Sequence, residues 1–146
     1  MTVRQAALRA LAQRRLTEAQ LWLRLERKGF PSEAISAAVA SCKRDGYLDD
    51  RLYAELFVHG RGGGDKPVGD ARLVATLVQR GIDREIAVAS VEGAPSTQAQ
   101  RCRAALDALL RRRPEMGYPS AARALERRAF PASVIYSVLR ERIGTT

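Results

Sequence analysis

The apolar residues of this chain recur at helical spacing and end at a characteristic helix–break–helix box. In its first copy, Leu25–Ile35, an amphipathic run closes at Lys28, and Gly29 follows where a helix ends. Glycine readily adopts the left-handed conformation of a helix C-cap, so we expect it here at Gly29. Phe30 is then an apolar plug, and Ser32 is predicted as the N-cap of the next helix.

The box returns twice. A second copy starts at Leu77, 52 positions after Leu25, and a third starts at Leu125, 48 positions further on. Gly81 holds the place of the glycine in the second copy, whereas Ala129 holds it in the third. Three copies at a spacing of about fifty residues are typical of a helical repeat protein. We therefore predict an all-α fold, an elongated array of three tandem three-helix repeats over residues 1–48, 49–95 and 96–146.

Periodicity and capping signals place the remaining helices of the first repeat. Residues 3–13 have apolar positions at helical spacing, and Thr17–Gln20 has the form of a capping box. In the helix that follows, Trp22 is expected to pack in the core. Leu23 lies nearly opposite the inner stripe, so it either contacts a neighbouring repeat, which is the commoner case, or is an exposed contact. The third helix is predicted over 32–44.

The segment Gly46-Tyr47-Leu48-Asp49-Asp50 joins the first two repeats. Asp49 is predicted to cap the following helix, and Asp50 to face its positive end. We expect this helix to stop at Gly60 and the glycine-rich segment 60–67 to be mobile, because ordering glycine costs much entropy. The apolar residues predicted to share one face of the helix are Leu52, Tyr53, Leu56 and Phe57.

The same signals complete the second and third repeats. A helix containing Leu73 and Val78 should end at Gly81, and Asp83 should cap a short helix that runs through Val91. A long helix is predicted over 97–112, followed by an arginine-rich helix and a last helix with Val134, Ile135, Val138 and Leu139 inward. No segment alternates with period two, so we predict nine helices in three groups of three.

The chain is strongly basic, and this bears on the kind of partner that it binds. The net charge is +9 and the pI is about 10.5, with 25 Lys and Arg against 16 Asp and Glu. The net charge is +5 over 1–48, −2 over 49–95 and +6 over 96–146. An anionic partner is therefore expected, nucleic acid first and an acidic protein or membrane surface second. Arginine far outnumbers lysine, which suits phosphate recognition but is equally compatible with codon bias.

The residues that could carry catalysis or bind a metal are few. His59 is the single histidine and has no evident partner, while helix capping accounts for Asp49 and Asp50. Cys42 and Cys102 lack neighbouring ligands, and Cys42 falls on an apolar stripe as a small buried residue. We expect no enzymatic activity, no cofactor and no metal. No apolar run approaches the length of a membrane span, and we expect a cytoplasmic protein.

The basic residues remain as candidates for function. A solvated charged face is the ordinary role of such clusters, but few acidic residues are interspersed here, which favours a binding surface. Seven aromatic residues besides Trp22 mostly fall on core stripes, which argues against a base-stacking platform. The candidate binding residues are Arg14, Arg15, Arg24, Arg27, Lys28, Arg72, Arg111, Arg112, Arg113, Arg123, Arg127 and Arg128.

Several of these motifs resemble the RecX family, bacterial regulators of the RecA recombinase. The resemblance covers nearly the whole chain and is strongest from Leu11 to Ile86. Two departures are Thr17, where serine is expected, and Asp70, where a proline is common after Gly69. The third box is also weaker, because Ala129 replaces the glycine. The residues that carry the resemblance are Lys28, Gly29, Phe30, Gly46, Tyr47, Leu48, Asp49, Asp50, Tyr53, Ala54, Gly69, Arg72, Leu77, Gly81 and Ile82.

The resemblance implies a curved array that lies in the helical groove of a RecA filament on single-stranded DNA. There it would bridge subunits and suppress ATP hydrolysis, strand exchange and filament growth, in homologous recombination, DNA repair and the SOS response. The expected partners are the RecA filament and single-stranded DNA, with double-stranded DNA as a further candidate, and the chain is expected to be a monomer. We also expect the two basic ends to hold DNA and the middle to contact protein.

Two other classes of function stay open from the sequence. A basic helical-repeat protein could bind DNA or RNA directly, and its affinity for bare nucleic acid would then depend steeply on salt. An adaptor that binds only acidic protein surfaces would ignore nucleic acid.

Overall fold

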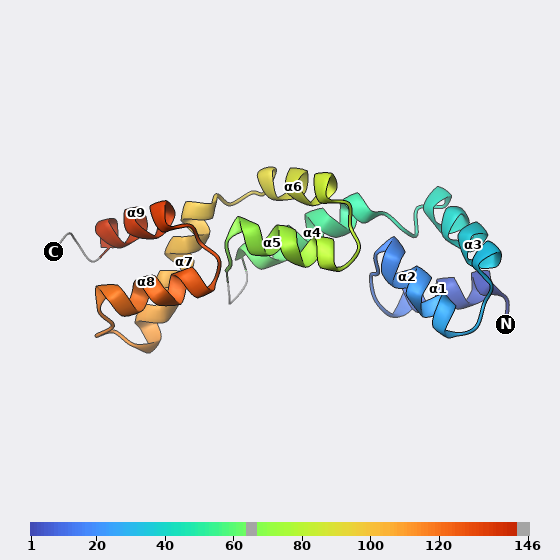
Figure 1. The fold of residues 1–146 in the computed structure, drawn as a ribbon, viewed down its shortest axis with the longest axis horizontal. Coiled ribbons are helices and arrows are strands. Elements are labelled where there is room, and N and C mark those ends of the chain that lie inside the picture. Colours follow the sequence, from blue (N-terminus) through green and yellow to red (C-terminus); the bar gives the residue numbers. More distant parts are fainter. Residues whose placement is uncertain (64–66, 143–146) are drawn as a thin grey trace.

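The computed structural model describes residues 1–63 and 67–142, and these residues form nine helices and no strand (Figure 1). The helices form an elongated row of three groups, here repeat 1 (α1–α3), repeat 2 (α4–α6) and repeat 3 (α7–α9). The predicted all-α array is therefore confirmed. The helices are α1 Val3–Gln13, α2 Glu18–Arg27, α3 Ser32–Arg44, α4 Asp50–Gly63, α5 Asp70–Gln79, α6 Arg84–Glu92, α7 Gln98–Arg112, α8 Tyr118–Arg127 and α9 Ala132–Arg142.

Each repeat has its own apolar core. The first is built around Leu21, Leu25 and Ile35, and Trp22 packs half-buried against it, as expected. Equivalent buried sets centre on Leu77 in repeat 2 and on Leu125 in repeat 3. Small separate cores are typical of solenoids, whose stability is the sum of repeat stabilities and the contacts between neighbours.

The box that defines the repeat is a Schellman C-cap. In repeat 1 the N–H of Phe30 donates to the carbonyl of Leu25 (3.3 Å), and that of Gly29 donates to Glu26 (3.0 Å). Repeats 2 and 3 make the same pair of bonds. These bonds satisfy carbonyls left free at the helix end, and the apolar residue after the cap returns to the core.

The left-handed conformation predicted for Gly29 is confirmed, with φ of +91°, and Gly81 has φ of +92°. Ala129 adopts the same conformation with φ of +69°. An L-residue in this region costs about 1–2 kcal/mol, so repeat 3 retains the break at the expense of backbone strain.

The predicted bounds of α3 are confirmed, but its predicted cap and the predicted end of α4 are wrong. The N-cap of α3 is Pro31, which makes no side-chain capping bond, and Ser32 is the first helical residue. The extended backbone of Pro31 starts the helix one residue earlier than a serine cap would require. In addition, α4 continues past Gly60 to Gly63. Glycine is only a weak helix breaker, and a Cβ on Gly60 would meet no neighbour. The remainder of the expected mobile loop, 64–66, lies outside the described residues.

Two predicted buried faces also differ. The core face of α4 carries Tyr53, Ala54 and Val58, whereas Leu52 and Leu56 are 46% and 41% exposed. Apolar residues surround this helix, and only the side that packs on α5 and α6 is covered. Leu23 is 44% exposed, so no neighbouring repeat covers it.

The repeats are connected at two equivalent joints, called joint 1–2 (between repeats 1 and 2) and joint 2–3 (between repeats 2 and 3). At joint 1–2, the Thr17 hydroxyl donates to the carbonyl of Arg80 (2.7 Å), and the N–H of Glu18 donates to Oδ1 of Asp50 (2.9 Å). Thus the start of α2 binds both the helix break and the first helix of repeat 2. Thr17 also caps α2 through a capping box, as predicted, and is fully buried.

Joint 2–3 uses the corresponding positions one repeat later. The N–H of Gly69 donates to the carbonyl of Arg128 (2.9 Å), and that of Asp70 donates to Oε1 of Gln98 (2.8 Å). A proline at position 70 has no N–H and would lose this second bond. Asp70, which stands where a proline is common, therefore supplies a contact between repeats 2 and 3.

A buried guanidinium distinguishes joint 2–3. Arg101 on α7 is 2% exposed, and it donates to the carbonyl of Val68 (2.7 Å) and to the carboxylate of Asp70. At the corresponding place in joint 1–2, Glu18 pairs instead with Lys43 of its own repeat (2.9 Å), with the Lys43 and Glu18 side chains 55% and 34% exposed, so this ion pair does not cross the joint. The two joints thus share backbone contacts but differ in how much charge they bury.

Candidate nucleic-acid interface

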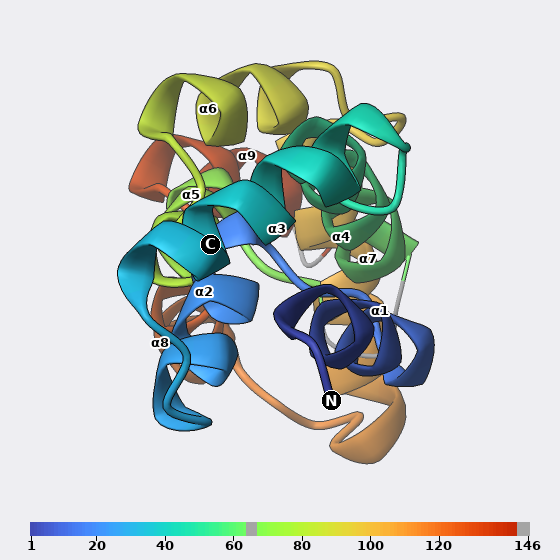
Figure 2. The same cartoon turned by 90° about the vertical axis from the view of Figure 1, so that its right-hand side faces the viewer.

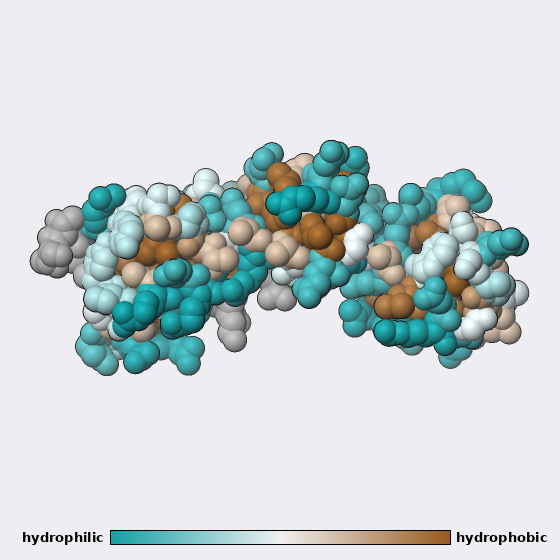
Figure 3. Space-filling view, in the orientation of Figure 1, coloured by the Kyte–Doolittle hydropathy of each residue, from teal (hydrophilic) through white to brown (hydrophobic). Residues whose placement is uncertain are grey.

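The two basic ends lie on one side of the array. Viewed along the long axis, α2 of repeat 1 and α8 of repeat 3 project onto the same side (Figure 2). Hydrophilic surface gathers along the lower edge at both ends, over α2 and α8 (Figure 3). A continuous anionic partner could therefore contact both ends at once.

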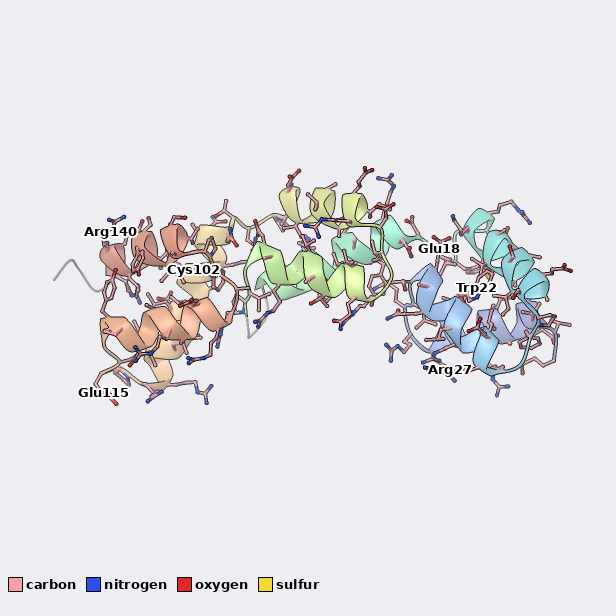
Figure 4. The ribbon with its side chains drawn as sticks, viewed as in Figure 1. Glu18, Trp22, Arg27, Cys102, Glu115 and Arg140 are labelled. Carbon is pink, nitrogen blue, oxygen red and sulfur yellow. The ribbon has the colours of Figure 1, made fainter. Side chains whose placement is uncertain are left out.

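In repeat 1 the predicted basic residues are mostly free in solvent. Arg14 and Arg15 follow the end of α1 and are exposed, as are Arg27 and Lys28 at the end of α2. Figure 4 shows Arg27 at the lower edge of this repeat. Arg24 is half-buried. Their position at helix ends also places positive charge near the negative ends of helix dipoles.

In repeat 3 the two predicted arginine groups converge on one hollow of about 430 Å³ between the end of α7 and α8. Arg112 and Arg113 line it from α7, and Arg123 and Arg127 line it from α8. All four side chains belong to exposed residues, and Arg111 is exposed beside them. The remaining lining residues are Leu109, Met116, Ser120 and Ala124.

Two other basic residues make hydrogen bonds within the fold, and a third is partly buried. Arg72 donates to the carbonyl of Arg127 across joint 2–3. Arg80 donates to the hydroxyl of Tyr53 (2.8 Å) and lies over the ring of Phe57, 4.8 Å from its centroid. Arg128 is half-buried, with a fully buried Nη1. The guanidiniums of Arg72 and Arg80 therefore help to hold the fold together, and that of Arg128 is partly withdrawn from solvent.

The basic triplets of α2 and α8 do not match residue by residue. Aligned on their boxes, Arg27 and Lys28 correspond to Arg127 and Arg128, but Arg123 corresponds to Leu23. The two triplets therefore share only two of their three positions. The second helix of repeat 3 therefore has a positive charge at Arg123, where the second helix of repeat 1 has the exposed Leu23.

The middle of the array has a different surface. Hydrophobic surface over α5 and α6 faces the viewer at the centre of Figure 3. Val78 on α5 is 39% exposed, while aligned positions in repeats 1 and 3 are the glutamates Glu26 and Glu126. The charge pattern of the sequence thus becomes a spatial pattern with basic ends and an apolar centre.

The motif residues 46–50 form the connection between repeats 1 and 2. Gly46 has φ of +81° and closes α3, and the side chain of Leu48 enters the core. Asp49 accepts from the N–H of Leu52 (3.1 Å), which confirms its predicted capping role. Asp50 lies in the first turn of α4 as expected and additionally binds α2. Tyr47 remains 59% exposed.

Burial alters the proton affinity of three groups. It raises the pKa of the Asp50 carboxyl, although the bond from the Glu18 N–H opposes this shift. Burial also raises the pKa of the Cys42 thiol, and that of Cys102 to about 11. Both thiols are fully buried and behave as small apolar groups, as predicted for Cys42.

Across 1–63 and 67–142, no three His, Cys, Asp or Glu side chains are grouped to hold a metal ion. His59 is exposed on α4. None of the helices in these ranges is both long and apolar enough to cross a bilayer. The fold and its surface define a tandem helical-repeat protein with basic ends.

Comparisons with known proteins identify the family. Residues 4–42 match the family model of the first three-helix domain of RecX. The chain is 32% identical over 96% of its length to the regulatory protein RecX of Thermobifida fusca, of which it covers 78%. It is 34% identical to a regulatory protein RecX of Thermus thermophilus, with 92% of this chain and 87% of that protein covered. The chain belongs to the RecX family of regulatory proteins.

The fold agrees with solved RecX structures. The crystal structure of RecX from Lactobacillus salivarius superposes with a TM-score of 0.80 at 20% identity, covering 95% of this chain and 93% of that one. A second RecX crystal structure has a TM-score of 0.77, also at 20% identity, covering 93% of this chain and 69% of that one. The three-repeat array is thus shared at low sequence identity.

Proposed function

We propose that this chain is a non-enzymatic regulator of RecA that acts in the cytoplasm as a monomer, without a cofactor. It binds the RecA–single-stranded DNA filament in its groove and inhibits ATP hydrolysis, strand exchange and filament growth. Membership of the RecX family supports the regulatory role. The structural observation that carries the proposal is a pair of basic ends on one side of an elongated array with an apolar centre.

This geometry suits a polymer whose surface repeats. The two ends contact phosphates that run through the filament, and the centre contacts recombinase subunits. Binding at several places along one array gains affinity through effective concentration, without any single strong contact. Arginine-rich ends also steer the protein toward a polyanion.

The test is the ATPase activity of RecA on single-stranded DNA, titrated with this protein. We expect inhibition at ratios well below one protein per RecA subunit, because a protein that bridges or caps a polymer affects many subunits. Inhibition that appears only in excess over DNA sites would instead indicate competition for DNA. No inhibition at any ratio would refute the proposal.

Charge reversal tests the division between ends and centre. Reversing Arg127 together with Arg123 should weaken filament binding several-fold or more and lower its salt dependence. Arg128 is less suitable, because its buried Nη1 links the substitution to folding. The control is Arg84→Glu on the exposed start of α6 in the acidic middle, compared with Arg127→Glu alone so that the change in charge is the same. Equal losses at both places would mean that only net charge counts.

A further inference from the structure

We infer that the hollow between α7 and α8 is a binding site for one unstacked nucleotide of a single strand, with its flanking phosphates. The inference rests on the proposed function and specifies one contact within it. The hollow combines four arginines with an apolar floor and measures about 430 Å³. Pockets of about 300–1,000 Å³ are usual for small-molecule ligands.

The four guanidiniums have been left without anionic partners. In the described part of the chain, the arginines that pair with carboxylates are Arg4, Arg101, Arg103 and Arg142. Within those same residues, no carboxylate lies at ion-pair distance from any of the four arginines of the hollow. Glu126, although on α8, lines a different cavity against α9. Repeat 3 therefore pairs Arg101, Arg103 and Arg142 with carboxylates and leaves these four available within one concavity.

Gathering four like charges in one concavity disfavours the folded state unless an anion relieves their repulsion. A planar guanidinium offers a two-pronged donor that matches a phosphate. A nucleic acid strand supplies one negative charge per nucleotide and can meet several arginines in succession. A single carboxylate would compensate only one of the four.

The apolar lining of the hollow favours a single strand over a duplex. Leu109, Met116 and Ala124 present apolar surface beneath the arginines. In a duplex the bases are stacked and paired, so only phosphates and sugars would reach the rim. An unpaired base or its sugar can enter the hollow and cover this apolar surface, and a base can also stack on the plane of an arginine guanidinium. The hollow should therefore bind a single strand more tightly than a duplex.

Repeat 3 provides this hollow through local differences from repeat 1. Its first helix has 15 residues where α1 has 11, and the added length carries the arginines past Leu109. On the second helix, Arg123 stands where repeat 1 has Leu23. The two basic ends are therefore not equivalent, and repeat 3 should supply the nucleotide site.

The experiment measures binding of the full chain to a short fluorescein-labelled oligothymidine and to a duplex of the same length across a salt series. The double variant Arg123→Glu and Arg127→Glu should lose about tenfold or more in affinity for the single strand. Its salt slope should fall by about 0.7 for each phosphate contact removed. The control is Arg140→Glu, an exposed arginine of α9 that Figure 4 places on the opposite edge from Glu115, and it should change little.

A second variant tests the floor without changing charge. Met116→Gln should weaken single-strand binding several-fold, leave the salt slope unchanged and reduce the preference over duplex. Leu110→Gln, a half-buried apolar residue of α7 outside the hollow, should leave that preference intact. Circular dichroism melting confirms that each variant is folded.

Three outcomes would overturn the inference. One is parental affinity for the single strand in the charge-reversed variant. Another is equal loss for single strand and duplex with no effect of Met116→Gln, which indicates phosphate contact alone. A third is normal oligothymidine binding with loss of RecA inhibition, which assigns the hollow to an acidic protein surface. Failure of the unaltered chain to inhibit RecA would refute the proposed function, whatever the oligonucleotide result.

Discussion

The two joints between repeats share the same arrangement of hydrogen bonds but differ in their charged side chains. In both, the first residues of a second helix bind the helix break and the first helix of the next repeat. At joint 2–3 the guanidinium of Arg101 is buried against Asp70, whose side chain is 43% exposed, whereas at joint 1–2 Glu18 forms only a surface pair with Lys43 of its own repeat. Surface pairs contribute about 0–1 kcal/mol, but breaking a buried pair costs about 3–5 kcal/mol. Repeats 2 and 3 should therefore separate less readily than repeats 1 and 2.

Asp70→Ala should give the largest effect, because it leaves the buried charge of Arg101 with only the carbonyl of Val68. We expect a loss of about 3–5 kcal/mol in urea unfolding followed by circular dichroism. The matched control is Glu18→Ala at the corresponding place in joint 1–2, which should cost about 0–1 kcal/mol. Trp22 lies in the first core, so its fluorescence should report little change for Asp70→Ala. Equal losses for the two variants would erase the distinction between the joints.

Gly69→Ala should have the next largest effect. A Cβ at position 69 would lie 2.0 Å from the carbonyl oxygen of Ala129 and 2.9 Å from the N of Phe130. These are backbone atoms that cannot move without opening joint 2–3, and overpacking costs about 1–3 kcal/mol or more. Gly60→Ala in α4 meets no neighbour and should be neutral or stabilising. Unfolding of Gly69→Ala like the parent would show that the close approach is unimportant.

Gly81→Ala separates backbone strain from contact at joint 1–2. Both Gly29 and Gly81 are left-handed, but a Cβ on Gly29 meets nothing, while one on Gly81 lies 2.2 Å from Cβ of Ala19. Each substitution should lose about 1–2 kcal/mol from strain, and Gly81→Ala more. Adding Ala19→Gly should recover only that excess, as measured by a double-mutant cycle. Equal effects of the two single variants would mean that the contact contributes nothing.

Ala129→Gly should have a smaller and favourable effect. Glycine relieves the strain of φ +69° at the break of repeat 3, but it increases the entropy of the unfolded chain. We expect a gain of about 1 kcal/mol or less in thermal or urea unfolding. A clear loss of stability would show that the methyl group of Ala129 contributes packing that outweighs the strain.

Asp50→Asn should change stability least at neutral pH. Burial raises the pKa of Asp50 above its unfolded value, so ionising this carboxyl lowers stability as pH rises through the unfolded and then the folded pKa. Asparagine keeps an oxygen for the Glu18 N–H without the charge, much as Gln98 does at joint 2–3. Above both pKa values, we expect Asp50→Asn to leave the free energy of unfolding unchanged or slightly increased. Between the two pKa values, the stability of the variant should depend less on pH than that of the parent. A marked loss would show that the charge of Asp50 is needed, for example by Lys43.

The helices and their breaks could be predicted from sequence because they depend on local interactions. The capping box at Thr17, the cap at Asp49 and the left-handed Gly29 each involve residues within a few positions of one another. The spacing of the boxes then determined the three repeats. The cap wrongly assigned to Ser32 and the end of α4 wrongly placed at Gly60 arose where a weak local signal competed with the extended backbone of Pro31 or with continued helical bonding.

Which charges are free depended on tertiary structure. The sequence singled out Arg72, which binds a carbonyl at joint 2–3, and it offered no reason to select Arg101. Arg101 lies on the inner side of α7, and this side is covered only because Gly69 and Asp70 pack against repeat 3. Burial of a charge depends on contacts some 30 residues apart along the chain, such as that of Asp70 with Arg101, a separation of 31. Local patterns do not encode such contacts.

The sequence by itself determined a basic, all-helical array with a thrice-repeated break, because periodicity, caps and net charge are properties of the chain. Only the tertiary structure decided that the arginines after Leu109 and those of α8 enclose one hollow, and that Leu23, Leu52 and Leu56 stay exposed. The reason is that a helix defines the faces on which its residues lie, but only its neighbours decide which face is covered.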